Sequence, residues 1–206
     1  MLKNYSKTGL LLLVVLLGAC GTQQTKIDGP TPQQQRQMAA QMALLKQEYE
    51  QALTTMRQAN YPLAIKQFVS FTETHPKYAG AYANLGILYH KMNQLDKSEK
   101  ALSKAVELNP KHAAAQNRLG MVYRELGRFD DALAAYNQAI LADDSYSDAY
   151  LNLGVLYDLY LFDGKKALEF YSKYQKMTGN KDSQVVMWIS ELIQRTQQAS
   201  QTNKTK

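Results

Sequence analysis

The sequence YANLGILY at residues 82–89 returns as QNRLGMVY at 116–123 and again as YLNLGVLY at 150–157. The glycine and the last tyrosine of each copy lie 34 residues from those of the next copy; these recurring residues are Gly86, Gly120 and Gly154, and Tyr89, Tyr123 and Tyr157. Self-similarity at a fixed period of this size is typical of repeat proteins, in which each repeat is one supersecondary unit. The spacing therefore predicts an array of similar units.

The residue types at the repeated positions predict two helices in each unit. Apolar residues three or four apart share one face of an α-helix. A glycine inside a helix costs about 1 kcal/mol relative to alanine, so close packing of a second helix must offset the cost of Gly86. Prolines such as Pro76 and Pro110, near the end of a period, stop the second helix. Stacking of neighbouring units then buries the faces that a single unit leaves open.

This pattern resembles the tetratricopeptide repeat, which has the same period and the same leucine-glycine, tyrosine, alanine and proline positions. The resemblance implies an all-α fold, a right-handed α-solenoid of about four helix pairs. It places the repeats at residues 45–78, 79–112, 113–146 and 147–181. Ten residues separate Tyr157 from Ala167, where nine separate Tyr123 from Ala132, so residues 161–164 contain one inserted residue in the turn between two helices.

Both ends of such an array need a cover. At the C-terminal end, Asp182-Ser183 offers a helix N-cap and predicts a capping helix over residues 182–197, with Trp188 as its packing anchor. Its apolar stripe consists of Val185, Trp188, Ile189, Leu192 and Ile193. At the other end, Met38, Met42 and Leu45 predict that an extension of the first helix, residues 38–44, covers the array. Residues 198–206 are polar and predict a frayed tail.

The N-terminus predicts export. Lys3 and Lys7 precede the apolar run 9–19, which at 11 residues is shorter than the roughly 18 that a membrane span needs. A basic start, a short apolar region and small residues at its end predict a secretory signal peptide over residues 1–19. The sequence then reads Leu17-Gly18-Ala19-Cys20, and Cys20 is the only cysteine of the chain.

This ending resembles the bacterial lipobox, which implies lipid attachment at Cys20 and cleavage before it. Two or more acyl chains give a stable membrane anchor. Gly21 stands where aspartate retains many lipoproteins at the inner membrane, so the resemblance implies the periplasmic face of the outer membrane. Residues 20–37 are rich in Gln, Thr, Pro and Gly and predict a flexible tether, although Thr31-Pro32 has the pattern of a helix start.

Several functional classes are disfavoured. The formal net charge is +6, but residues 45–181 contain 17 Lys+Arg against 15 Asp+Glu with no basic run, which counts against nucleic-acid binding. The three histidines lack metal-ligand spacing, and no phosphate loop or nucleophile motif occurs. We therefore expect no catalytic residue, no metal site, no cofactor besides the lipid and no small-molecule substrate.

The candidate binding residues come from the resemblance, in which the first helix of each pair lines a concave groove. Position six of the four repeats reads Glu50, Asn84, Arg118 and Asn152, a polar column that is similar to the asparagine ladder by which some members hold a peptide backbone. Asparagine both donates and accepts, whereas arginine suits a carboxylate. The candidate groove residues are Asn84, Ile87, His90, Asn117, Arg118, Met121, Arg124, Leu151, Asn152 and Val155.

The sequence thus predicts a non-catalytic scaffold that holds a peptide or helix of an envelope protein. Lipoproteins of this kind resemble type IV pilus pilotins, peptidoglycan-hydrolase adaptors and accessory components of TonB-type systems. Two other classes stay open: a protein that acts on peptidoglycan, and a self-assembling structural unit.

Overall fold

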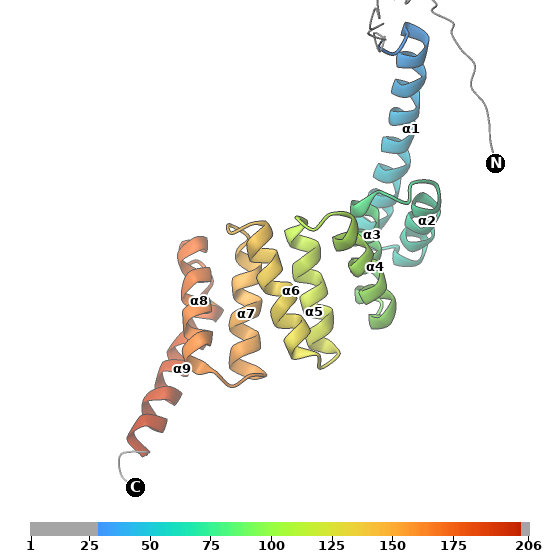
Figure 1. Cartoon of the computed structure of the whole chain (residues 1–206). Helices are drawn as coiled ribbons and strands as arrows, with labels where there is room; N and C mark the ends of the chain where they lie inside the picture. Colours follow the sequence, from blue (N-terminus) through green and yellow to red (C-terminus); the bar gives the residue numbers. More distant parts are fainter. Residues whose placement is uncertain (1–28, 203–206) are drawn as a thin grey trace, which may run out of the picture. The chain divides into compact units, whose positions relative to one another are not determined.

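The computed structural model describes residues 29–202, which contain nine α-helices and no strand (Figure 1). The helices are α1 (Pro32–Arg57), α2 (Tyr61–Thr74), α3 (Ala79–Lys91), α4 (Leu95–Leu108), α5 (Ala113–Glu125), α6 (Phe129–Ala142), α7 (Ser147–Leu159), α8 (Gly164–Thr178) and α9 (Ser183–Thr202). None of these helices is both long and apolar enough to span a membrane. The predicted signal peptide and Cys20 lie outside the described residues.

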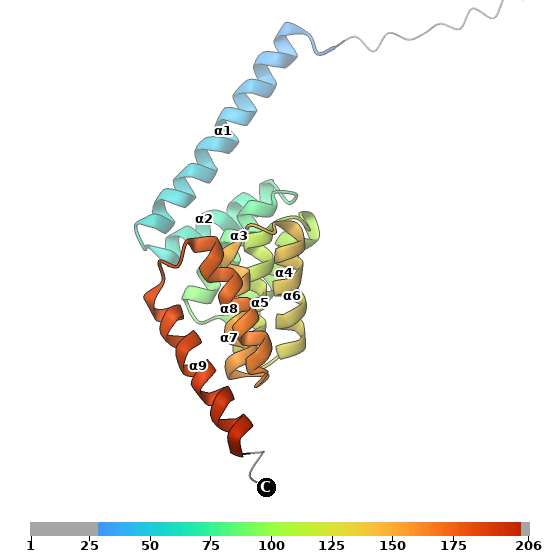
Figure 2. The same cartoon turned by 90° about the vertical axis from the view of Figure 1, so that its left-hand side faces the viewer.

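The chain divides into two compact units, residues 1–39 and 40–206. In the second unit, α3 packs on α4, α5 on α6, and α7 on α8, and each pair packs on the next through α4–α5 and α6–α7 (Figures 1 and 2). Residues of α1 and α2 share one buried cluster, which includes Ala52, Ala64 and Phe68. The prediction of a helical solenoid with about four helix pairs and a C-terminal capping helix is therefore confirmed.

At the repeated glycines the two helices of a pair approach each other closely. A Cβ atom added to Gly120 would lie 2.6 Å from the Tyr136 ring, and one added to Gly154 would lie 2.4 Å from the Tyr171 ring. At Gly86 the Cβ would meet the Leu102 side chain at 2.3 Å. The bulky residue of the second helix thus occupies the space that the missing side chain leaves.

The recurring tyrosines fill the space between neighbouring repeats. Tyr157 is 8% exposed, and the half-buried Tyr123 packs against the cores of two successive repeats. Tyr89 packs in the same way at the N-terminal end of the array.

The lengths of the turns between paired helices show where the inserted residue lies. Three residues join α3 to α4 and α5 to α6, whereas four residues, 160–163, join α7 to α8. The prediction of one extra residue in this turn is confirmed. A residue with positive φ stands in each turn: Ala59, Asn93, Gly127 and Phe162.

The two ends differ in part from the sequence prediction. Asp182 Oδ1 accepts hydrogen bonds from the backbone N–H groups of Gln184 and Val185, which confirms the N-cap. However, α9 runs to Thr202, so the first part of the predicted tail is helical. Likewise α1 begins at Pro32, where Thr31 and Gln34 cap each other's N–H groups, so residues 32–37 of the predicted tether are helical.

The predicted N-terminal extension, residues 38–44, is part of α1. Met38 and Met42 are largely exposed, at 57% and 64%. Only Leu45 of the predicted set packs against the first core cluster. The reason is length, since the 14 residues of α2 pair with only part of the 26-residue α1.

Candidate functional site

The candidate residues lie on one surface of the second unit, formed by the first helix of each pair. We call this surface the ladder face and define it by the groove candidates together with Tyr49 and Glu50. Helix α3 contacts α5, and α5 contacts α7, so side chains on adjacent first helices can meet. Three polar contacts between successive first helices, one of them between α1 and α3, join residues that are 35 apart in sequence.

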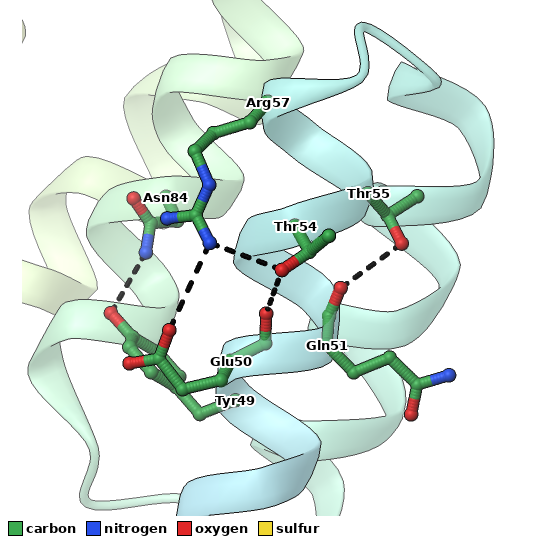
Figure 3. A network of polar contacts seen from close by, with 7 residues as sticks. All are labelled: Tyr49, Glu50, Gln51, Thr54, Thr55, Arg57 and Asn84. Atoms are coloured by element: carbon green, nitrogen blue, oxygen red, sulfur yellow. Dashed lines mark hydrogen bonds and ion pairs between the residues drawn. The ribbon is translucent and has the colours of Figure 1, made fainter.

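Both asparagines of the polar column bind a side chain of the preceding repeat. Asn84 Nδ2 donates to the Tyr49 hydroxyl at 2.8 Å (Figure 3), and Asn152 Nδ2 donates to Asn117 Oδ1 at 2.9 Å. Burial raises the pKa of Tyr49, so its hydroxyl stays protonated. The structure places Asn117 at the base of the face, only 2% exposed. These contacts tie repeats together and leave the side-chain carbonyl oxygens of Asn84 and Asn152 as acceptors.

Glu50, which opens the polar column, faces a cation of its own helix. Its carboxylate lies 3.9 Å from the guanidinium of Arg57, which also donates to Thr54 (Figure 3). At the ends of the first helices, His90 Nε2 lies 2.8 Å from the Glu125 carboxylate. These groups therefore already have polar partners inside the fold.

Arg118 differs from the asparagines because no polar group faces it in the preceding repeat. The residue 35 positions earlier is Ala83, which is 5% exposed. Instead the Arg118 Nη1 lies 3.9 Å from the sulfur of Met121 on its own helix. Within residues 29–202 no carboxylate forms an ion pair with Arg118, although its charge acts on the nearby Tyr146 hydroxyl. The guanidinium can therefore pair with a carboxylate of a ligand.

Arg124 is the second cation of α5 without a carboxylate in the described part of the chain. Its Nε is buried and has no hydrogen-bond partner there, and its guanidinium carbon lies 5.8 Å from the Tyr160 ring centroid. Residues three apart on a helix share a face, so Arg118, Met121 and Arg124 form one stripe. The remaining candidates, Ile87, Leu151 and Val155, are half-buried apolar side chains. The site can therefore hold an anionic segment against apolar surface.

Sequence reasoning missed two contributors to this region. Tyr49 was not a candidate, although it occupies position five of its repeat directly before the polar column. Asp158 was also missed; its side chain is 8% exposed and pairs with Arg195 of α9. The 35-residue offset between paired positions would have pointed to Tyr49, but the Arg195 contact depends on the path of α9. No three metal-ligating side chains converge among the described residues.

The Tyr136 hydroxyl is a buried polar group that has no hydrogen-bond partner in the described residues. Tyr136→Phe is expected to leave the free energy of unfolding near neutral pH unchanged or to raise it by about 1 kcal/mol, because an unsatisfied hydroxyl is removed. Tyr171→Phe is the matched control, since that hydroxyl donates to Asp158 at 3.5 Å. We expect a loss of about 1 kcal/mol for the control, measured by urea unfolding. A clear loss for Tyr136→Phe would contradict the assignment.

The same variant has a defined pH dependence. Burial raises the pKa of Tyr136 to about 12, above the value of about 10 in an unfolded chain. Because the folded-state pKa is the higher one, the stabilisation is complete below pH 10 and is lost as the pH rises to 12. Between these pH values the free energy of unfolding of the natural protein should therefore fall more steeply than that of Tyr136→Phe.

Comparisons with known proteins identify the repeat. Two family models described as tetratricopeptide repeat match the chain, one at residues 79–144 and one at residues 117–178. Residues 79–178 are therefore tetratricopeptide repeats. No curated protein matches the chain in sequence.

Solved structures of tetratricopeptide-repeat proteins share the fold. A crystal structure of MamA is 20% identical over 79% of this chain and 93% of its own, with a TM-score of 0.62. PilF of Pseudomonas aeruginosa is 18% identical over 75% of this chain and 69% of its own, with a TM-score of 0.67. The first repeat domain of Spaghetti, bound to an HSP90 peptide, is 19% identical over 57% of this chain and 92% of its own, with a TM-score of 0.54.

Proposed function

We propose that this chain, whose residues 79–178 are tetratricopeptide repeats, is a non-catalytic scaffold that holds a segment of a protein partner on its ladder face. The observation that carries the proposal is the pair of arginines on either side of Met121, Arg118 and Arg124, for which the described part of the chain provides no carboxylate partner. A peptide bound to a similar repeat domain in a solved structure supports the class of ligand. The partner segment supplies a carboxylate to α5 and backbone groups to Asn84 and Asn152.

We further propose that the scaffold is a lipoprotein, anchored through Cys20 to the periplasmic face of the outer membrane. The support is the lipobox-like sequence after an apolar run, together with Gly21 after the cysteine. In this setting the anchor raises the local concentration of the scaffold around its membrane partners, so that a modest affinity for the partner is enough to form the complex. Its partner then belongs to an envelope complex, such as a pilus and secretin assembly or a TonB-type system.

Arg118→Glu tests the scaffold proposal. The variant places a carboxylate where the partner carboxylate binds, and like charges in close contact repel. We expect recovery of the partner from envelope extracts on the immobilised full chain to fall about tenfold or more, measured by quantitative mass spectrometry.

Lys66→Glu is the matched control, because it makes the same change of charge at an exposed residue of α2, outside the ladder face. It should leave recovery of the partner unchanged. If every protein retained by the natural chain is retained equally by Arg118→Glu, the ladder face is not the binding surface.

A further inference from the structure

A pocket of about 550 Å³ opens between the last repeat and the capping helix, at the end of the ladder face, with which it shares Val155. Helix α7 contributes Val155 and Leu159 to its walls, and α9 contributes Trp188. We propose that this pocket, which we call the cap pocket, binds a bulky apolar side chain of an extended partner segment, next to a basic residue of that segment. This inference rests on the proposed function and adds a second specificity site to it.

The walls of the cap pocket are fixed from both sides. The Asp158 carboxylate of α7 pairs with Arg195 of α9 and also accepts a hydrogen bond from the Tyr171 hydroxyl at 3.5 Å. The Trp188 and Tyr171 ring centroids lie 5.8 Å apart. A pocket whose walls are already in place loses little conformational entropy when a ligand binds.

The apolar surface of the pocket is open to an incoming side chain. Leu159 is 55% exposed, and Trp188 and Val155 are only partly buried. A volume of about 550 Å³ lies within the range of ligand pockets and exceeds the volume of one large side chain. The pocket therefore suits an aromatic or leucine anchor together with part of the adjoining backbone.

The charges around the cap pocket favour a basic residue next to the apolar anchor of the partner segment. Arg195 neutralises Asp158 inside the pocket, whereas Glu191 on its rim is exposed and makes no ion pair within the described residues. A basic residue of the partner would complement Glu191. Helix α5 has the opposite charge preference, since its two arginines complement an acidic residue of the partner segment. The charges thus fix the direction of the segment, with its acid over α5 and its base beside α9.

The spacing between acid and anchor follows from helix packing. Packed helices lie about 8–10 Å apart, so the distance from α5 past α7 to the cap pocket is roughly 15 Å. An extended chain advances about 3.3 Å per residue. The partner segment should therefore carry its apolar anchor about four or five residues from its acidic residue.

Selection of random 12-residue peptides displayed on phage tests the proposal, with the immobilised full chain as the target. We expect the selected peptides to share an aromatic or leucine residue beside an arginine or lysine, with an acid four or five residues away. Fluorescein-labelled copies should bind in anisotropy titrations and shift the emission of Trp188, the only tryptophan of the chain. Replacing the apolar anchor of the peptide with alanine should weaken binding at least tenfold.

Leu159→Glu should also weaken binding at least tenfold. The matched control is Leu141→Glu, at an α6 leucine that is 77% exposed outside the pocket, and it should have no effect. Some selected peptides could require Arg118 for binding, yet bind Leu159→Glu equally well and leave the Trp188 emission unchanged. That result would contradict the proposal for the cap pocket and would leave the proposal for the ladder face standing. Failure to select any binding peptide would count against both the cap pocket and the ladder face as binding sites. If Leu159→Glu instead converts a dimer of the full chain into monomers, a second copy occupies the pocket and the proposal is wrong.

Discussion

Cys20→Ser is expected to move the protein from the membrane fraction to the soluble periplasmic fraction. Each buried methylene of an acyl chain contributes about 0.8 kcal/mol to membrane binding, and two or more chains anchor a protein stably. No helix within residues 29–202 can replace that anchor by spanning the membrane. Serine has no thiol to accept the lipid, so the expected redistribution is nearly complete. Fractionation followed by immunoblotting measures it.

Metabolic labelling with a palmitate analogue provides the direct readout of the anchor. The natural chain and the control Thr22→Ser should both incorporate the label, and Cys20→Ser should not. Continued incorporation in Cys20→Ser would show that the lipid is attached elsewhere.

Gly154→Ala is expected to lower the free energy of unfolding by about 2 kcal/mol, roughly a 30-fold change in the folding equilibrium. The new Cβ would lie 2.4 Å from the ring of Tyr171, which is 1% exposed and therefore has little room to move. Overpacking of a core costs about 1–3 kcal/mol, and so short a contact with a buried ring belongs at the upper end, about 3 kcal/mol. The gain of about 1 kcal/mol in helix propensity offsets part of this cost and leaves about 2 kcal/mol. Urea unfolding, followed by circular dichroism, gives the value.

Gly164→Ala is the control within the same repeat. The atoms nearest to a Cβ there are methyl carbons of Leu192 and Thr196 at 3.2 Å, which need to give way by only a few tenths of an ångström. We expect its free energy of unfolding to stay within about 0.5 kcal/mol of the natural value. Equal losses for the two variants would contradict the view that Gly154 is required for close approach of α7 and α8.

Most of the fold could be predicted from the sequence because the packing contacts recur with the same period as the sequence motifs. A glycine and a bulky residue recur at matched positions, and each pair makes the same close contact, as at Gly120 and Tyr136. Even the extra residue between α7 and α8 was visible as a change of spacing. The ends were less predictable, since no neighbouring repeat constrains them. That is why Met42 is exposed and α9 runs beyond residue 197.

The candidate site was predicted in outline, but not in its pairings. The sequence indicates which positions share a face, yet the offset between neighbouring repeats decides which side chains meet. Asn84 and Asn152 therefore looked free for a ligand, although each donates its side-chain N–H to the preceding repeat. Arg118 has no such partner only because Ala83 stands at the facing position. A contact such as that between Asp158 and Arg195 depends on how the capping helix leaves the array, which no periodic pattern encodes.

Crosslinking in living cells tests the central claim, that the ladder face holds a protein partner, most directly. A photoreactive amino acid at position 121 lies between Arg118 and Arg124, and one at position 66 lies on α2 outside the ladder face. The account predicts an envelope protein crosslinked at position 121, absent at position 66, and lost when Arg118→Glu is added. The same proteins crosslinked from both positions, or a crosslink at position 121 that survives Arg118→Glu, would contradict it.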